Sequence, residues 1–316
     1  MHQDLNDWLD DVWKKRKEIV AASKVAGFIR GRGASYQMNP GTMMIYRMYS
    51  GSGAASEVKT SYLKAMKGEL VQLEREIGTP PEAQGVEEWV NWSKGDMAKA
   101  ESKDLTNKFF HYRHNNRQSV YRIYVNANIA TRGKLFREIV SSLWSLDSLS
   151  NAKVDTSDGR ADTIVIYLET KIATENALAS IAKYHRKNPN LFGSALPKLV
   201  VPADYKGYQM RGVGTAMEPP TFAVISTGGE FFRRDEMQSF GGYRSRLIFM
   251  ALERTRWEVK GQSGQERQTA FKNRVEKYFR RAGIDPNRPA EQGAVEDLPP
   301  IATIQDWANK TDGSFV

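Results

Sequence analysis

The sequence has no cysteine and only four histidines, and these absences exclude much common chemistry. Without cysteine there is no disulfide scaffold, iron–sulfur cluster, thiolate zinc site or cysteine nucleophile. Only His111 and His114 are close in sequence, and the neighbouring cations Lys108, Arg113 and Arg117 oppose metal binding there. We therefore predict that any reaction uses oxygen and nitrogen groups, with no metal and no cofactor.

Long apolar runs and familiar catalytic motifs are also absent. No stretch approaches the ~20 apolar residues of a membrane span, and the first residues, MHQDLNDWLDDVWKKRK, lack an apolar signal core. The P-loop, HExxH and GxSxG patterns do not occur. We expect a cytoplasmic protein without a membrane partner. Secretion into a host cell by a type III system is the alternative, although the four early aspartates do not suit an acid-poor leader.

The remaining composition is that of a folded protein with an excess of positive charge. Of the 316 residues, 40% are hydrophobic, and 46 Lys and Arg outnumber 37 Asp and Glu, which gives a net charge of +9. Such a surface favours anionic partners, namely phosphorylated or acidic peptides, nucleic acid or membrane headgroups. No nucleic-acid recognition motif is present, so nucleic acid is the disfavoured member of this group.

Hydrophobic periodicity predicts helices in the first third of the chain and a mixed pattern after it. Helices are expected over 4–28, 54–77 and 86–108, and a short helix or strand over 43–46. Strands are expected over 119–126, 151–155 and 163–168, with helices over 134–144 and 175–184 between and after them. A loop-rich tract follows, with an edge strand over 222–225, and helices over 239–254 and 265–281 come last.

These elements predict an α+β fold in which an N-terminal helical region precedes a small mixed β-sheet flanked by helices. The expected divisions are a mainly helical region over 1–116, an α+β domain over 117–290 and an extended tail over 291–316.

Basic and aromatic residues in the β-rich half form the candidate site. On a strand, Arg122 shares one face with Tyr124. The other candidates lie in or beside predicted strands, loops and turns: Lys153, Arg160, Tyr167, Arg211 and Arg244. Together they are suited to an anion pocket, because guanidinium groups match a phosphate dianion and a lysine crowded by cations has a lowered pKa. Such a pocket suits proton abstraction with phosphate departure, which is β-elimination.

Five segments carry a resemblance to a known family: YRIYVNAN, NAKVDTSDGRADTIVIYLET, RGVGTAMEPP, QSFGGYRSRLIFMALE and FKNRVEKYFRRAGIDPNRPA. In their order and spacing, from about 120 to 290, the chain resembles the HopPsyA-type (Hop A group) type III effectors. The same family includes lyase proteins of class V lanthipeptide and thioamitide biosynthesis. A more distant similarity is to the OspF/SpvC phosphothreonine lyases, so the resemblance implies a phosphothreonine-lyase-like fold.

The lyase similarity implies a role for several positions. Lys153 corresponds to the base that removes the Cα proton, Tyr167 to a tyrosine facing the phosphate, and Arg160 to a phosphate-binding arginine. Arg122, Arg211 and Arg244 are further candidates for phosphate binding. The Lys-x-His strand of the lyases reads Arg122-Ile123-Tyr124 here, so the proton donor is Tyr124, His111 or His114, or else the pocket binds phosphate without turnover.

The implied function is that of a phosphoserine/phosphothreonine lyase that converts a phosphorylated peptide to dehydroalanine or dehydrobutyrine. In lanthipeptide or thioamitide biosynthesis its partners would be a precursor with a leader peptide and a separate kinase. The alternative is a type III effector that acts on host phosphoproteins or binds host immune-signalling proteins.

Overall fold

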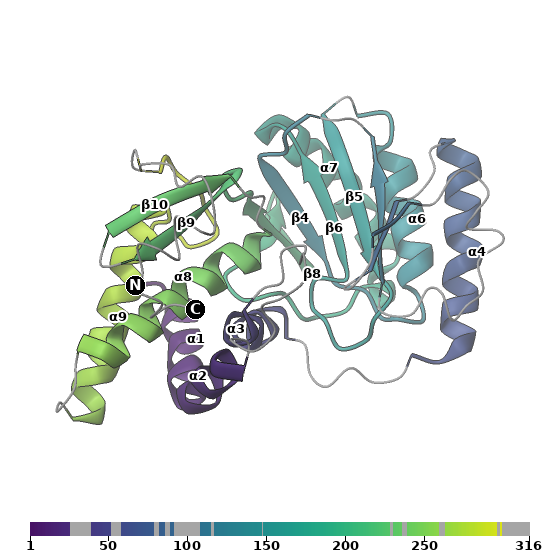
Figure 1. Cartoon of the computed structure of the whole chain (residues 1–316). Helices are drawn as coiled ribbons and strands as arrows, with labels where there is room; N and C mark the ends of the chain where they lie inside the picture. The colour runs from purple at the N-terminus through teal and green to yellow at the C-terminus, as the bar shows by residue number, and fades with distance from the viewer. Residues whose placement is uncertain are drawn as a thin grey trace. The chain divides into compact units, whose positions relative to one another are not determined.

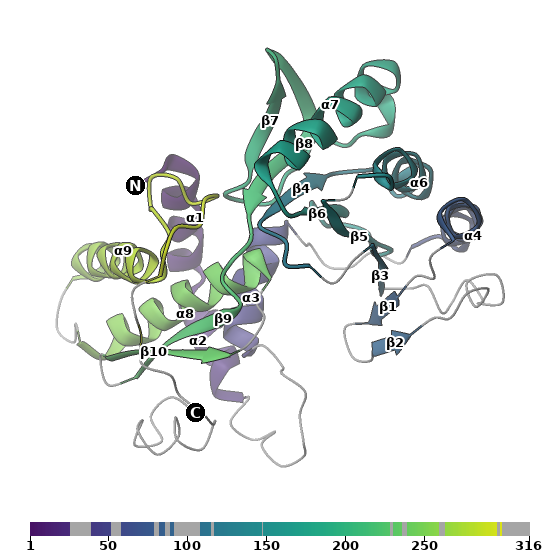
Figure 2. The same ribbon diagram turned by 90° about the horizontal axis from the view of Figure 1, so that it is seen from above.

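The computed structural model describes most of the chain and divides it into two compact units. The described residues are 1–25, 39–51, 58–78, 82–85, 89–91, 108–114, 117–146, 148–227, 230–235, 239–258, 263–295 and 298. The central unit is continuous and spans Ser50–Met217. The terminal unit combines both ends of the chain, Met1–Tyr49 and Glu218–Val316. Figure 1 labels most elements of both units, and Figure 2 also labels β1, β2, β3 and β7.

The central unit is built on an eight-stranded sheet in the order β2-β1-β3-β5-β6-β4-β8-β7. Every strand pair described in it is antiparallel. The strands are β1 (Glu82–Gly85), β2 (Trp89–Asn91), β3 (Lys108–Arg113), β4 (Tyr121–Val125), β5 (Leu149–Asp155), β6 (Ile164–Leu168), β7 (Val201–Tyr205) and β8 (Tyr208–Met217). Antiparallel strands allow short connections, and Lys206 and Gly207, both at positive φ, form the two-residue turn between β7 and β8.

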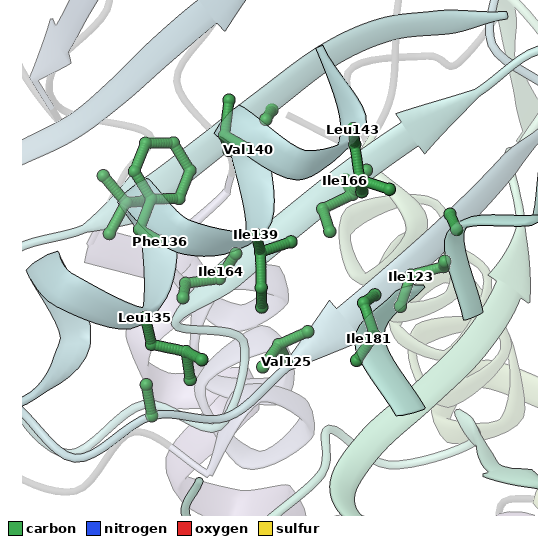
Figure 3. Packing of buried hydrophobic residues seen from close by; sticks show 14 of the residues in the cluster. Ile123, Val125, Leu135, Phe136, Ile139, Val140, Leu143, Ile164, Ile166 and Ile181 are labelled. Atoms are coloured by element: carbon green, nitrogen blue, oxygen red, sulfur yellow. The ribbon is translucent and has the colours of Figure 1, made fainter. Parts of the chain in front are cut away.

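Three helices pack on one face of this sheet, as the view in Figure 2 shows. They are α4 (Thr60–Ile77), α6 (Arg132–Leu143) and α7 (Lys171–Lys187). Their apolar side chains meet alternate residues of the central strands, such as Ile123 and Ile166, in one buried cluster (Figure 3). Because successive side chains of a strand point to opposite faces, this cluster leaves the other residues of the same strands on the face away from the helices.

The terminal unit is mainly helical and combines Met1–Tyr49 with Glu218–Val316. Its elements are α1 (Gln3–Lys14), α2 (Arg16–Val25), α3 (Pro40–Ser50), α8 (Phe240–Glu258), α9 (Gly264–Arg281) and the hairpin of β9 (Phe222–Thr227) and β10 (Glu230–Asp235). Trp13 stacks on Phe271 with ring centres 5.6 Å apart. Lys272 Nζ lies 2.5 Å from a carboxylate oxygen of Asp10, and this contact lowers the pKa of Asp10.

Several sequence expectations are confirmed. The fold is α+β, and the order strand, helix, strand, strand, helix is found as β4, α6, β5, β6 and α7. In the terminal unit, the predicted final helices are α8 and α9. A capping box between Ser263 and Glu266 begins α9, since each side chain bonds the other residue's backbone N–H.

Other expectations are corrected by the structure. The sheet is antiparallel where it is described, not mixed, and its helices cover one face. The helix expected over 86–108 is wrong at Trp89–Asn91, which pair with β1 as a strand, and at Lys108, which begins β3; 92–107 lie outside the described residues. The helix expected over 4–28 is two helices that meet at Lys15.

The loop-rich tract is also mostly strand. Its many glycines favoured loops in the sequence analysis, but Gly214 lies inside β8. Glycine is needed at this position because a Cβ would lie 2.5 Å from Val200 Cγ1. Close approach, not chain flexibility, therefore accounts for this glycine. The expected edge strand over 222–225 is β9, paired with β10.

The expected divisions at 1–116, 117–290 and 291–316 do not coincide with the two units. The β1 to β3 segment joins the sheet through pairing with β5, whereas α8 and α9 pack with the N-terminal helices. None of the helices in the described residues is long and apolar enough to cross a membrane.

The contact between α4 and α6 gives a paired stability prediction. A Cβ on Gly133 of α6 would lie 2.8 Å from Met66 Cα, whereas a Cβ on Gly68 of α4 would meet nothing within 4 Å. We expect Gly133→Ala to destabilise the central unit by about 1–3 kcal/mol through overpacking. We expect Gly68→Ala to stabilise it by ~0.5–1 kcal/mol, since alanine favours a helix interior. Urea unfolding followed by circular dichroism measures both, and equal effects would contradict this packing.

Candidate functional site

The sheet face opposite the helices carries most of the predicted site, and we call it the polar face. It is defined by side chains of four neighbouring strands: His111 and Arg113 of β3, Asn151 and Lys153 of β5, Tyr167 of β6, and Arg122 and Tyr124 of β4. Their strand neighbours Phe110, Ala152, Ile166 and Ile123 belong to the buried cluster under the helices. Alternation along each strand therefore fixes which residues reach the polar face.

Strand register arranges these residues in two adjacent rows. In the first row, His111 pairs with Lys153, Lys153 with Val165, and Val165 with Tyr124. In the second row, Arg113 pairs with Asn151, Asn151 with Tyr167, and Tyr167 with Arg122. The predicted base, a predicted phosphate-binding arginine and two tyrosines thus come from strands that are consecutive in the sheet.

Contacts between the side chains link the two rows. Arg122 Nη1 donates a hydrogen bond to Tyr124 Oη at 3.1 Å. The Arg122 guanidinium carbon lies 5.1 Å from the centre of the Tyr167 ring, and Lys153 Nζ lies 5.9 Å from the same ring. Arg122 is only 4% exposed. Tyr167 therefore contacts both cations, which is a cation–π arrangement that holds them near each other despite their like charge.

Phe109 extends this arrangement, although the sequence analysis assigned it no role. Lys153 Nζ lies 4.7 Å from the centre of its ring, and the Arg160 guanidinium carbon lies 5.0 Å from it. The two adjacent phenylalanines in KFFHYR interrupt the alternation of apolar and polar residues that identifies a strand in sequence. If Lys108–Arg113 is known to be a strand, Phe109 and His111 are expected on the same face.

Arg160 lies beside this group but is held by carboxylates. Its Nε and Nη2 donate to the two oxygens of Asp162 at 2.9 and 2.7 Å, and Nε is 3.5 Å from Asp155. Burial raises the pKa of Asp155, while Arg160 and Arg132 oppose that shift. This paired arrangement stabilises the β5–β6 connection, so a phosphate would compete with Asp162 for Arg160.

The two histidines lie on different sides of the sheet. Burial, followed by the positive charges of Lys153 and Arg113, lowers the pKa of His111 to about 3. His111 is therefore neutral at pH 7. His114 lies on the helix side of the sheet, where its ring packs edge-on against Trp144 with centres 4.7 Å apart. Of the three predicted proton donors, Tyr124 alone combines a place on the polar face with a hydroxyl hydrogen bonded to a cation.

The two remaining predicted arginines lie outside the two rows of the polar face. Arg244 belongs to the terminal unit, where it is fully buried and donates from Nε to the Pro289 carbonyl at 2.8 Å. Arg211 lies in β8 with an exposed side chain, and its carbonyl oxygen is 3.1 Å from His185 Nε2 on the helix side.

Asn151 is a further residue that the sequence analysis did not single out. Its Oδ1 is buried and has no hydrogen-bond partner within the described residues. Because an unsatisfied buried acceptor costs free energy, this oxygen is suited to accept a hydrogen bond from an N–H of a bound molecule. Asn151 pairs with Tyr167 in the second row. Nothing in the sequence distinguishes it from a surface asparagine.

The geometry defines an α+β protein whose antiparallel sheet is covered by helices on one face and lined by cations and tyrosines on the other. A family model described as the HopA1 effector protein family matches residues 100–291. This is more than half of the chain, so the chain belongs to the HopA1 effector protein family, and the predicted resemblance to Hop A effectors is confirmed.

Solved structures agree with this assignment at the level of fold. An effector protein from Pseudomonas syringae pv. tomato strain DC3000 is 16% identical, with a TM-score of 0.54, over 91% of this chain and 100% of that one. An effector protein from Pseudomonas syringae pv. syringae strain 61 is 15% identical, with a TM-score of 0.50, over 92% of this chain and 96% of that one. No match was found among curated proteins.

The charge of His111 gives a prediction for the polar face. We expect its ring signals in NMR spectra to show no titration between pH 8 and about pH 5, because its pKa is about 3. Lys153→Met removes a nearby positive charge and should raise this pKa. Lys183→Met, at an exposed position of α7, is the matched control and should leave it unchanged. A midpoint near 6.5 in the unaltered protein would contradict the burial of this ring.

Proposed function

We propose that the polar face binds a phosphorylated serine or threonine of a peptide and removes its phosphate by β-elimination. One observation carries this proposal: Lys153, Arg122, Tyr124 and Tyr167 lie in adjacent rows, and Tyr167 contacts both cations. An amine for the proton and a guanidinium for the phosphate thereby lie on one face of the sheet. Elimination from a phosphate ester requires a base and stabilisation of the leaving phosphate, and the sheet fixes the separation of the two groups proposed to supply them.

The phosphate end of the substrate would lie against Arg122 and Tyr124. Arg122 is a permanent cation with several donors, and its Nη1 already points to Tyr124 Oη. A phosphate dianion accepts hydrogen bonds from both groups, and the charge of Arg122 stabilises the negative charge that develops on the leaving oxygen. Tyr167 supports Arg122 from the neighbouring strand.

The reaction is written with this chain's own groups. The neutral amine of Lys153 takes the Cα proton, the Cα–H electrons form the Cα=Cβ double bond, and the Cβ–O bond breaks with its electrons on the departing phosphate. The products are dehydroalanine or dehydrobutyrine and inorganic phosphate, which makes the protein a carbon–oxygen lyase. This step requires Lys153 in its neutral, deprotonated form.

Tyr124 is the group we propose as proton donor to the phosphate. Its hydroxyl lies beside Arg122, whose positive charge stabilises the oxygen anion left after donation. His111 carries no extra proton at neutral pH, because burial and two cations lower its pKa. The hydrogen bond from Arg122 and the lowered pKa of His111 both support Tyr124 over His111 as the proton donor. Tyr124 would then take the role of the histidine in the Lys-x-His strand of the lyases.

Two biological settings suit this activity. In one, the substrate is a precursor peptide with a leader, phosphorylated by a separate kinase in the same cytoplasm. In the other, the chain is secreted into a host cell and acts on host phosphoproteins or binds immune-signalling proteins. The family name and the two Pseudomonas syringae effectors favour the second setting.

The lyase proposal is tested by mass spectrometry of phosphothreonine and phosphoserine peptides incubated with the full chain in EDTA. We expect each peptide to lose the mass of H₃PO₄, which distinguishes elimination from hydrolysis, where only HPO₃ is lost. Lys153→Ala should reduce the rate by about 10²–10⁴-fold, as expected for loss of a general base. Lys183→Ala, an exposed lysine of the same unit, should retain full activity.

Variants of the phosphate end separate binding from proton transfer. Arg122→Lys should raise KM, because one ammonium replaces a planar set of donors. Tyr124→Phe should mainly lower kcat, since it removes the proposed proton but retains the ring. Unchanged peptides across both residue types, or elimination that is equal in Lys153→Ala, would overturn the proposal.

The secreted setting has its own test. The full chain fused to a calmodulin-dependent adenylate cyclase is expressed in Pseudomonas syringae with and without a working type III system. Cyclic AMP in plant cells that depends on the secretion system would support the effector setting. No signal, beside a positive control effector, would favour the biosynthetic one.

A further inference from the structure

The terminal unit contains a pocket that is separate from the polar face, whose residues all belong to the central unit. The pocket has a volume of about 380 Å³ and lies between the first two helices and α8 and α9. Its apolar residues include Trp13, Val20 and Leu252. Trp13 and Leu252 are buried, so the pocket is a recess with an apolar floor and not an apolar projection.

Four lining residues of α2 fall along one helical face. They are Arg16, Lys17, Val20 and Ala21, which are spaced at i, i+1, i+4 and i+5, and Trp13 of α1 lines the pocket beside them. The α2 residues cover about 7.5 Å along the helix axis, at ~1.5 Å per residue. On the other side, Leu252, Thr255 and Arg256 follow the i, i+3, i+4 spacing along α8. These residues of α2 and α8 line two sides of the pocket, which we call the groove.

Positive charge surrounds the apolar floor. Arg16, Lys17, Arg256 and Arg267 line the pocket, and no acidic residue does so among the residues that the structure describes there. Lys17, Arg256 and Arg267 are exposed and come from three different helices. The charges are therefore spread around the rim, which suits several carboxylates on one partner better than a single small anion.

The floor is held in place before any partner binds. Trp13 stacks on Phe271, and the Arg16 guanidinium carbon lies 4.5 Å from the centre of the Trp13 ring. Arg16 Nη1 also donates to the Trp13 carbonyl oxygen at 2.8 Å. A preformed floor reduces the ordering cost of binding.

We propose that this groove binds an acidic amphipathic helix of a partner protein. Apolar side chains of that helix, at i, i+3 or i+4 and i+7, would fill the floor, while its Asp and Glu side chains would meet the rim cations. The row of α2 residues, about 7.5 Å long, corresponds to about one and a half turns of such a helix. A lipid surface is disfavoured because Trp13 and Leu252 are recessed and cannot insert into a bilayer.

The test uses fluorescence anisotropy with the full chain and a labelled designed peptide of about 14 residues. Its Leu residues follow helical spacing and its other positions are mainly Glu; a matched peptide carries Lys in place of each Glu. We expect the Glu peptide to bind, with an affinity that falls as salt rises, and the Lys peptide not to bind. Lys17→Glu with Arg256→Glu should weaken binding by at least about tenfold.

A charge-matched control is available on the same unit. Lys277→Glu with Arg280→Glu alters two exposed cations of α9 that do not line the pocket, and it should change the affinity by less than about twofold. Ala21→Trp fills the groove without changing its charge, so it should also abolish binding. Both double variants and Ala21→Trp must retain the circular dichroism spectrum and melting temperature of the unaltered chain.

Three results would overturn the proposal. Equal loss in both double variants would assign the binding to the overall positive charge. Equal binding of the Glu and Lys peptides would remove the role of the rim. Tighter, Ala21→Trp-sensitive binding to phosphatidylglycerol vesicles than to the Glu peptide would assign the groove to a lipid surface.

Discussion

The register between β3, β5, β6 and β4 is the constraint on which the candidate site depends. One face of these strands is buried under α4, α6 and α7, through residues such as Ile123, Ile166 and Ala152. A shift of one residue in any of these strands would turn its apolar set away from the helices, at a large cost in hydrophobic free energy. The same constraint keeps Arg122, Lys153 and Tyr167 on the opposite face. The polar face is thus specified by the core behind it.

Several like charges on one sheet face would repel one another without intervening groups. The structure separates them with aromatic rings, since Tyr167 contacts Arg122 and Lys153, and Phe109 contacts Lys153 and Arg160. Asp162 balances Arg160, while His111 stays neutral beside Lys153. Arg122, Arg113 and Lys153 are the remaining basic groups of the face, and Arg122 and Lys153 are the two groups assigned to phosphate and proton in the proposed reaction.

The parts of the fold that could be predicted from the sequence are those with a simple local period. Alternation in Tyr121–Val125 and the apolar run Ile164–Leu168 identify two central strands, and helical spacing identifies α4, α7 and α9. The β1–β2 hairpin could not be recognised, because Trp89 and Trp92 have the spacing of a helix and only pairing with distant strands decides the conformation.

The register between strands also depends on residues far apart in the sequence. The pairing of His111 with Lys153 could therefore not be predicted, although each residue was a candidate for a separate reason. Arg244 shows the opposite limit: a buried arginine that bonds backbone carbonyls looks the same in sequence as one that binds phosphate.

The assembly of the terminal unit from both ends of the chain has a consequence for synthesis on the ribosome. Residues of the central unit are contiguous, so they can reach their final structure once Met217 has emerged. The first helices cannot complete their packing at that stage, because Trp13 packs on Phe271 and the backbone N–H of His2 donates a hydrogen bond to the Pro286 carbonyl at 2.8 Å. Their apolar faces remain without these partners until α9 and Pro286 have been made. Until then α1 is an exposed amphipathic segment, accessible to a chaperone before it becomes part of a folded core.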